Sequence, residues 1–230
     1  MKRYLITGAN RGIGRAIAEK LAAPETTLLL HGRDQAALAQ TCRSAEAKGS
    51  RTISLRYDLA HKSQIEKLIE EIGAESLDAF VNNAGIAIVK PLGAISVEEW
   101  NKTLAVNVTA PFLLTQKLSA NMKTGASIVN ILSIAAKSGF ANWSSYCMSK
   151  FALEGFSQSI REELRPRGIR VLNIYPAATD TEIWNPVEGD WPREKMMSPG
   201  EIAEAVSYAL SRPSDIAVEN ITLTKTSGSL

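Results

Sequence analysis

The sequence predicts an α/β fold in which helices cover both faces of a doubly wound parallel sheet. Short apolar runs recur along the chain with helical stretches between them, which is the pattern of successive βαβ units. The runs lie at residues 5–6, 28–30, 53–55, 79–81, 128–132 and 171–174, and a last strand is expected at 220–224. Because no repeat, low-complexity tract or linker interrupts the pattern, we expect a single domain over residues 1–230.

Composition narrows the class of partner. Of the 230 residues, 45% are hydrophobic and 22% are charged, which is enough apolar material for a large core. Lys and Arg together number 26 against 24 Asp and Glu, so the chain lacks the charge excess typical of proteins that bind nucleic acid or anionic membranes. We therefore expect a small-molecule partner.

The cysteines and the first residues indicate the compartment. Cys42 and Cys147 lack the spacing of metal ligands and are too few for a disulfide framework. The chain enters a strand-like run without a signal sequence, and no apolar stretch is long enough to cross a membrane. We expect a cytoplasmic protein without a metal site.

The helices are expected where apolar residues recur at amphipathic spacing. They lie at 14–22, 35–48, 62–72, 97–121, 145–165 and 200–211. Two carry a capping box at their start, Ser96 with Glu99 and Ser198 with Glu201, the second with Pro199 at the first helical position.

A glycine-rich loop follows the first strand and opens a helix. Free N–H groups and the positive end of the helix dipole at such a loop can face a pyrophosphate. The alternative is that the glycines only permit a tight turn. A nucleoside-triphosphate loop is excluded because no Lys-Ser or Lys-Thr pair follows the glycines. The predicted cofactor-binding residues of the loop are Gly8, Asn10, Arg11, Gly12, Ile13 and Gly14.

The end of the second strand decides the cofactor. A basic group there binds the 2′-phosphate of NADP, and an acidic group binds the ribose 2′-hydroxyl of NAD. Arg33 and Asp34 offer both, but a strand that ends at Leu30 leaves Arg33 nearer the pocket and Asp34 at a helix N-cap. Arg11 could reach the same phosphate. We predict NADP(H), with NAD and a pair of solvated surface arginines as the alternatives.

Residues after the third and fourth strands complete the expected nucleotide site. Asp58 and Leu59 follow the third strand, where Asp58 either accepts from the adenine amino group or caps the next helix. Asn83, Ala84 and Gly85 follow the fourth strand and can pack against the phosphate loop and the adenosine ribose.

Tyr146 and Lys150 are the candidate proton-transfer pair. Positions four apart share one helix face, so the phenol and the ammonium can lie side by side. A tyrosine has a pKa of about 10, and a cation about 4–5 Å away lowers it by roughly two to three units, enough for general acid–base catalysis. The same spacing also occurs on ordinary amphipathic surface helices.

Two further residues are candidates for the same chemistry. Ser133 follows the strand expected at 127–132, where its hydroxyl either holds a reacting oxygen or caps the next segment. Pro111 stands four positions after Asn107, so it should free the Asn107 carbonyl and kink the helix. That carbonyl could hold a water for a proton relay toward Lys150, or the kink could serve packing alone.

Taken together and in this order, these motifs resemble the short-chain dehydrogenase/reductase family of the compact type. The resemblance implies a Rossmann-like sheet of about seven strands and hydride transfer between a nicotinamide and a carbonyl or secondary alcohol. It implies that Tyr146 exchanges the proton, Ser133 positions the oxygen, Lys150 binds the nicotinamide ribose and Asn107 anchors the water. It also implies a homodimer or homotetramer formed through the helices at 97–121 and 145–165.

The sequence departs from the family pattern after the sixth strand. The family's usual Pro-Gly is here Pro176-Ala177, while Thr179 and Thr181 match its carboxamide-facing threonine, so all four are expected near the nicotinamide. The tail lacks the glycine-rich close of many members. The Pro-interrupted segment at about 182–199 is expected to cover the substrate or, alternatively, a subunit interface.

Two other functions are alternatives to the oxidoreductase. A non-catalytic NADP(H)-binding redox sensor needs neither Tyr146 nor Lys150, and both are present. A nucleotide-sugar epimerase or dehydratase shares the Tyr-Lys pair, but members of that group have a different glycine loop and a longer C-terminal substrate domain, and this chain has neither feature. The retained pair favours the oxidoreductase.

Overall fold

The centre of the molecule is a seven-stranded parallel sheet. The computed structural model describes residues 1–187 and 189–228, so Glu188 of the predicted covering segment and the last two residues of the predicted domain lie outside it. The strands are β1 (Lys2–Ile6), β2 (Thr26–His31), β3 (Arg51–Leu55), β4 (Ala79–Asn82), β5 (Ser127–Ile131), β6 (Arg170–Pro176) and β7 (Asn220–Leu223). Their order across the sheet is β3-β2-β1-β4-β5-β6-β7.

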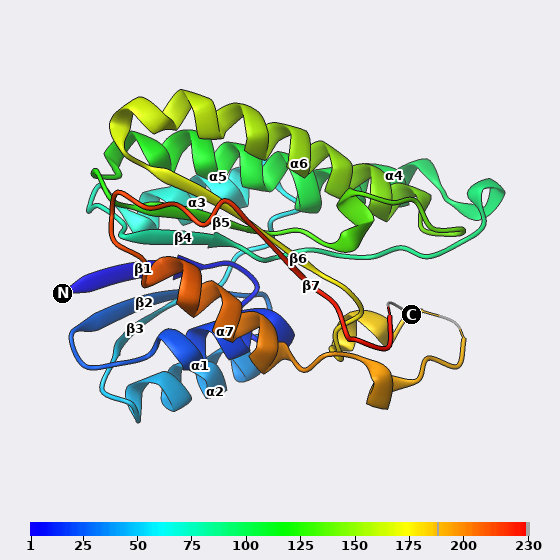
Figure 1. The fold of residues 1–230 in the computed structure, drawn as a ribbon, viewed down its shortest axis with the longest axis horizontal. Helices are drawn as coiled ribbons and strands as arrows, with labels where there is room; N and C mark the ends of the chain where they lie inside the picture. The colour runs from blue at the N-terminus through cyan, green and yellow to red at the C-terminus, as the bar shows by residue number, and fades with distance from the viewer. Residues whose placement is uncertain (188, 229–230) are drawn as a thin grey trace.

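Helices cover both faces of the sheet, as Figure 1 shows. One layer holds α1 (Gly12–Leu21), α2 (Gln35–Glu46) and α7 (Pro199–Leu210). The other holds α3 (Lys62–Ile72), α4 (Val97–Leu104), α5 (Ala110–Leu118) and α6 (Ser144–Leu164). The predicted Rossmann-like fold is confirmed.

The two layers have separate hydrophobic cores because side chains alternate along each strand. Ile6 and Leu30 pack into the core beneath α1 and α7, whereas their neighbours Leu5 and Leu29 pack into the core beneath α3 and α5. All four are fully buried. Burial on both faces explains why these strands are continuous apolar runs in the sequence.

The helix starts follow the predicted caps. The Ser96 hydroxyl accepts from the N–H of Glu99 at 3.2 Å, and the Ser96 N–H donates to the Glu99 carboxylate at 3.0 Å. The Ser198 N–H donates to Glu201 in the same way at 2.6 Å. These bonds satisfy N–H groups that have no partner inside the helix.

The helix predicted at 97–121 is broken. A π-helical turn over Ala105–Thr109 separates α4 from α5, and Ser119–Asn121 forms a 3₁₀ turn. Pro111 has no N–H to donate to the Asn107 carbonyl four residues earlier, so the regular ladder cannot pass this point. The predicted kink therefore takes the form of a π-turn that contains Asn107.

The order of the strands reverses between β1 and β4, which opens a crevice at their carboxyl ends. An asparagine row, formed by Asn82 of β4 and Asn130 of β5, crosses the sheet beside this crevice, because the two residues lie in register. The Asn82 Nδ2 donates to the Asn130 Oδ1 at 3.0 Å, and the Asn130 Nδ2 donates to the Ser157 hydroxyl of α6 at 3.0 Å. The bonds tie the strand that leads into the crevice to the helix that carries Tyr146.

We expect Asn130→Ala to lower the free energy of unfolding by about 3 kcal/mol, because it leaves a cavity and removes one buried hydrogen-bond partner each from Asn82 and Ser157. Urea denaturation followed by circular dichroism measures the change. Asn121→Ala, at an exposed asparagine, is the control. Equal stability of the two variants would show that the asparagine row contributes nothing.

Candidate active site

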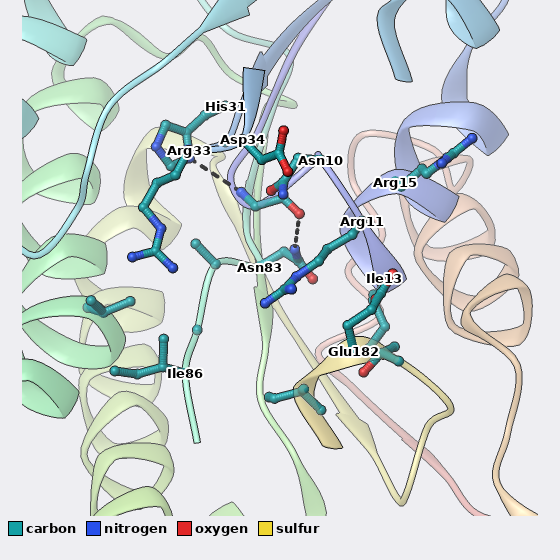
Figure 2. A pocket seen from close by; sticks show the side chains of 18 of the residues that line it. Asn10, Arg11, Ile13, Arg15, His31, Arg33, Asp34, Asn83, Ile86 and Glu182 are labelled. Carbon is teal, nitrogen blue, oxygen red and sulfur yellow. Dashed lines mark hydrogen bonds between the residues drawn. The ribbon is translucent and has the colours of Figure 1, made fainter. Parts of the chain in front are cut away.

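A cavity of about 560 Å³ occupies the crevice at the carboxyl ends of β1 to β5 (Figure 2). Predicted site residues that line it come from six separate stretches of the chain. They are Gly8, Asn10, Arg11, Gly12, Ile13, Arg33, Asp58, Leu59, Asn83, Ala84, Gly85, Tyr146, Lys150 and Thr181. The fold therefore brings most of the predicted residues together around one space.

The loop between β1 and α1 lines the cavity together with the first turn of α1. Gly8 has a φ of +66°, and a Cβ on Gly14 would lie 2.2 Å from the Gly8 carbonyl oxygen, so the turn requires glycine at both positions. Helix α1 has no side-chain cap at its N-terminus and no acidic residue in its first turn. Such an end attracts an anion, so the loop fits the pyrophosphate of a dinucleotide.

Hydrogen bonds from β4 hold this loop in place. The Thr7 hydroxyl donates to the Val81 carbonyl at 3.2 Å and accepts from the N–H groups of Asn83 and Ala84 at 3.0 and 3.1 Å. The Asn83 amide donates to the carbonyls of Thr7 at 2.8 Å and Gly8 at 3.2 Å. Asn83 is thus a part of the loop's support as well as a lining residue.

His31 is a lining residue that the sequence analysis missed. Its Nδ1 accepts from the Gly8 N–H at 3.3 Å, and its Nε2 lies 3.0 Å from the Tyr57 carbonyl oxygen. Because a carbonyl oxygen only accepts, Nε2 carries the proton and donates it in this hydrogen bond. Burial lowers the pKa of His31 to about 4, against an ordinary value of 6.5. A neutral ring therefore joins β2, the loop and the end of β3. The sequence feature that could have indicated this role is the place of His31 at the end of β2, one residue beyond Leu30, where the strand was expected to end.

At the end of the cavity that follows β2, Arg33 and Asp34 have different partners. The Asp34 carboxylate accepts from the Ala37 N–H at 3.0 Å, which is the predicted N-cap of α2. The half-exposed Arg33 side chain extends over the cavity, as does Arg11 from the loop (Figure 2). Asp58 lies 3.7 Å from the Arg33 guanidinium and accepts from the Ala60 N–H at 3.0 Å. His61, and not Asp58, is the N-cap residue of α3.

Tyr146 and Lys150 line the other end of the cavity. The Lys150 amine donates to the Ile131 carbonyl at 2.8 Å and lies 5.6 Å from the centre of the Tyr146 ring. Ser133 accepts from the Ala135 N–H at 3.1 Å, as the capping alternative predicted, and its hydroxyl also hydrogen-bonds Tyr146. The capping and catalytic interpretations of Ser133 are therefore compatible.

The expected lowering of the Tyr146 pKa by Lys150 is wrong for this structure. Burial raises the pKa of Tyr146 to about 12, opposed only in part by the hydrogen bond with Ser133. Burial also lowers the pKa of Lys150 to about 8. Desolvation favours the neutral form of each group, and the Lys150 amine is directed to a backbone carbonyl.

Asn107 uses its side chain to join three segments. Its Oδ1 accepts from the Ile86 N–H at 2.9 Å, and its Nδ2 donates to the Ile86 carbonyl at 2.8 Å and to the Ser149 hydroxyl at 3.0 Å. Ser149 in turn donates to the Tyr146 carbonyl at 2.7 Å. Asn107 lies behind the cavity wall, where it couples the segment after β4 to the second turn of α6.

The segment after β6 contributes only one of its predicted residues to the cavity lining. Thr181 lines the cavity, while the buried Thr179 hydroxyl donates to the Ala177 carbonyl at 3.0 Å. Pro176 pairs with Leu223 of β7, and the Ala177 N–H donates to the Leu223 carbonyl at 2.9 Å. Among the described non-glycine residues, only Glu25 and Asn142 have a positive φ, so Ala177 is unstrained where the family has glycine.

Comparison with known proteins agrees with this arrangement. Residues 2–190 match the model of the short chain dehydrogenase family. The chain belongs to the short-chain dehydrogenase family. A sepiapterin reductase of Chlorobaculum tepidum is 35% identical over 98% of this chain and 97% of its own length. A 3-oxoacyl-[acyl-carrier-protein] reductase of Aquifex aeolicus is 34% identical over 91% of this chain and 90% of its own length.

Solved structures share the fold of this short-chain dehydrogenase. An angucycline C-6 ketoreductase with bound NADP superposes with a TM-score of 0.86 at 29% identity, covering 96% of this chain and 93% of its own. A metagenomic short-chain oxidoreductase in complex with NADP has a TM-score of 0.83 at 29% identity and covers 98% of both chains. Within the described residues, no helix has the length and apolar character needed to cross a membrane.

The depressed pKa of His31 predicts a pH-dependent stability. Between the ordinary pKa of 6.5 and the folded value of about 4, the unfolded chain binds the proton and the folded chain does not. The contribution of His31 to the free energy of unfolding is therefore fully present above pH 6.5. It is lost as the pH is lowered to 4, by up to about 3 kcal/mol.

The measurement is urea denaturation across this pH range. We expect His31→Gln to remove most of the decline, since the glutamine side chain does not titrate. The only other histidine is His61, and His61→Gln should leave the decline unchanged. A decline of the same size in His31→Gln would assign it to other groups.

Proposed function

We propose that this short-chain dehydrogenase is an NADP(H)-dependent oxidoreductase that transfers a hydride between the nicotinamide and a carbonyl or secondary alcohol. The observation that carries the proposal is a single cavity that joins an arginine-lined end at Arg11 and Arg33 to a tyrosine and lysine end at Tyr146 and Lys150. The phosphate loop lies between the two ends. A dinucleotide has this sequence of chemical groups, from adenosine through pyrophosphate to nicotinamide.

The choice of NADP rests on the charges at the adenosine end. Asp34 is engaged as the cap of α2, whereas Arg33 and Arg11 can offer charge-assisted hydrogen bonds to a 2′-phosphate. The similar angucycline ketoreductase and metagenomic oxidoreductase hold NADP, which supports the same cofactor here. Gly8, Gly12 and the N-terminus of α1 would hold the pyrophosphate.

The proton is handled by the chain's own side chains. The reduced nicotinamide, when bound, supplies the hydride. Tyr146 is neutral at physiological pH, so its hydroxyl can donate a proton to the carbonyl oxygen of the substrate. Ser133 would hold the same oxygen, and the Lys150 amine, beside Tyr146, would bind the nicotinamide ribose. Asn107 would anchor the relay water, and its hydrogen bond to Ser149 holds the turn that carries Tyr146.

We also propose that the chain forms a homodimer or homotetramer through α4, α5 and α6. The outer faces of these helices expose Val97, Trp100, Phe112 and Phe151, with exposed fractions between 37% and 69%. Large apolar side chains gathered on one helical layer are typical of a subunit contact.

Tyr146→Phe tests the proton donor. We expect kcat for carbonyl reduction to fall at least about a hundredfold, because the acid is lost, while the affinity for NADPH stays within about threefold. Steady-state turnover assays measure kcat, and fluorescence titration with NADPH measures the affinity. Near-normal turnover in this variant would remove Tyr146 from the mechanism.

Arg33→Ala tests the cofactor choice. We expect the Kd for NADPH to rise about tenfold to a hundredfold, the effect of losing one charge-assisted pair, with the Kd for NADH changed by less than about threefold. Parallel fluorescence titrations measure both constants. Arg43→Ala, at an exposed arginine of α2 away from the cavity, should change neither. Equal losses for both cofactors in Arg33→Ala would contradict recognition of the 2′-phosphate.

A further inference from the structure

Three of the four tryptophans form one cluster beside Tyr146. The ring of Trp143 packs edge-on against Tyr146, with centroids 5.5 Å apart, and against Trp184 at 5.4 Å. Trp191 lies 4.8 Å from Trp184 and 6.5 Å from Trp143. This tryptophan cluster adjoins the ring of the proposed proton donor.

The cluster is built from two chain segments that flank the Tyr146 end of the cavity. Trp143 immediately precedes α6, while Trp184 and Trp191 belong to the segment after β6, whose Thr181 and Ile183 line the cavity. All three tryptophans are half-buried, so part of each ring surface remains accessible.

The segment that carries Trp184 and Trp191 is braced. The Trp184 indole N–H donates to the Thr179 carbonyl at 3.0 Å. The Arg193 guanidinium donates to the Asp180 carboxylate at 2.7 Å and to the side-chain Oδ1 of Asn185 at 3.0 Å. The indole rings are therefore held in position before any substrate arrives, which lowers the entropy lost on binding.

We propose that Trp143, Trp184 and Trp191 form the substrate-facing wall of the site and select ketones with a planar aromatic ring. The inference rests on the proposed function, because it places the carbonyl at Tyr146. A planar ring packed against indoles gains the attraction between aromatic quadrupoles in addition to burial, whereas a saturated ring gains burial alone. A wall that only excluded water would need no such concentration of aromatic rings.

The test uses two bicyclic ketones with the same carbon skeleton, 2-tetralone, which contains a benzene ring, and 2-decalone, which is saturated. With NADPH, we expect a kcat/KM about fivefold to tenfold higher for 2-tetralone, the effect of one or two aromatic contacts. Trp184→Leu should reduce this preference to less than about twofold, and Trp184→Phe should retain most of it. Tyr208→Leu, at an exposed aromatic of α7, is the control and should keep the full preference.

Binding to the enzyme saturated with NADP⁺, measured by calorimetry, gives a readout that does not depend on turnover. If neither ketone is reduced but 2-tetralone binds more tightly and Trp184→Leu abolishes the difference, the proposed function fails and the aromatic wall stands. Equal kcat/KM and equal binding of the two ketones in the wild-type protein overturn the wall and leave the proposed function intact. If the preference for 2-tetralone survives in both Trp184→Leu and Trp191→Leu, the aromatic wall is overturned as well. If Trp184→Phe loses the preference as fully as Trp184→Leu does, the effect belongs to the indole hydrogen bond, and the selection by aromatic rings is overturned.

Discussion

The junction between β1 and β4 is the constraint on which the rest of the site depends. At this point the strand order reverses, and Thr7 and Asn83 bind each other's backbone so that the two strands end side by side. The phosphate loop can then leave β1 with Gly8 held from two directions, by Asn83 and by His31. The other lining residues lie on α1, α2 and α6, on the π-helical turn, and at or just after the carboxyl ends of β2 to β6.

Burial gives the two ends of the cavity different electrostatic character. At the end lined by Tyr146 and Lys150, burial raises the pKa of Tyr146 and lowers the pKa of Lys150, so both groups are driven toward their neutral forms. His31, beneath the loop, is shifted in the same sense. The guanidinium of Arg33 instead remains half-exposed at the opposite end. Desolvation thus separates a buried end suited to proton transfer from an exposed cationic end suited to a phosphate.

The segment after β6 contacts elements at both ends of the cavity. Thr181 packs near Gly12 of the phosphate loop, where a glycine Cβ would lie 3.1 Å from the threonine methyl, while Trp184 packs against Trp143 at the start of α6. The same short segment thus contacts both the loop between β1 and α1 and the start of the helix that carries Tyr146. An ion pair between Arg193 and Asp180 keeps it against the body of the protein.

The sequence by itself determined the layered fold, the glycine-rich turn after β1 and the neighbouring positions of Tyr146 and Lys150 on one helix, because strand periodicity, capping residues and glycine spacing are local signals. The burial of these side chains and the groups toward which they point were decided only by the tertiary structure. Local spacing placed Lys150 beside Tyr146, yet burial raises the phenol's pKa and the amine binds the Ile131 carbonyl. The part of His31 in the loop and the meeting of Trp143 with Trp184 depend on contacts between segments far apart in the chain. Such contacts, and the loss of solvent that accompanies them, leave no periodic mark in the sequence, so they could not be predicted from it.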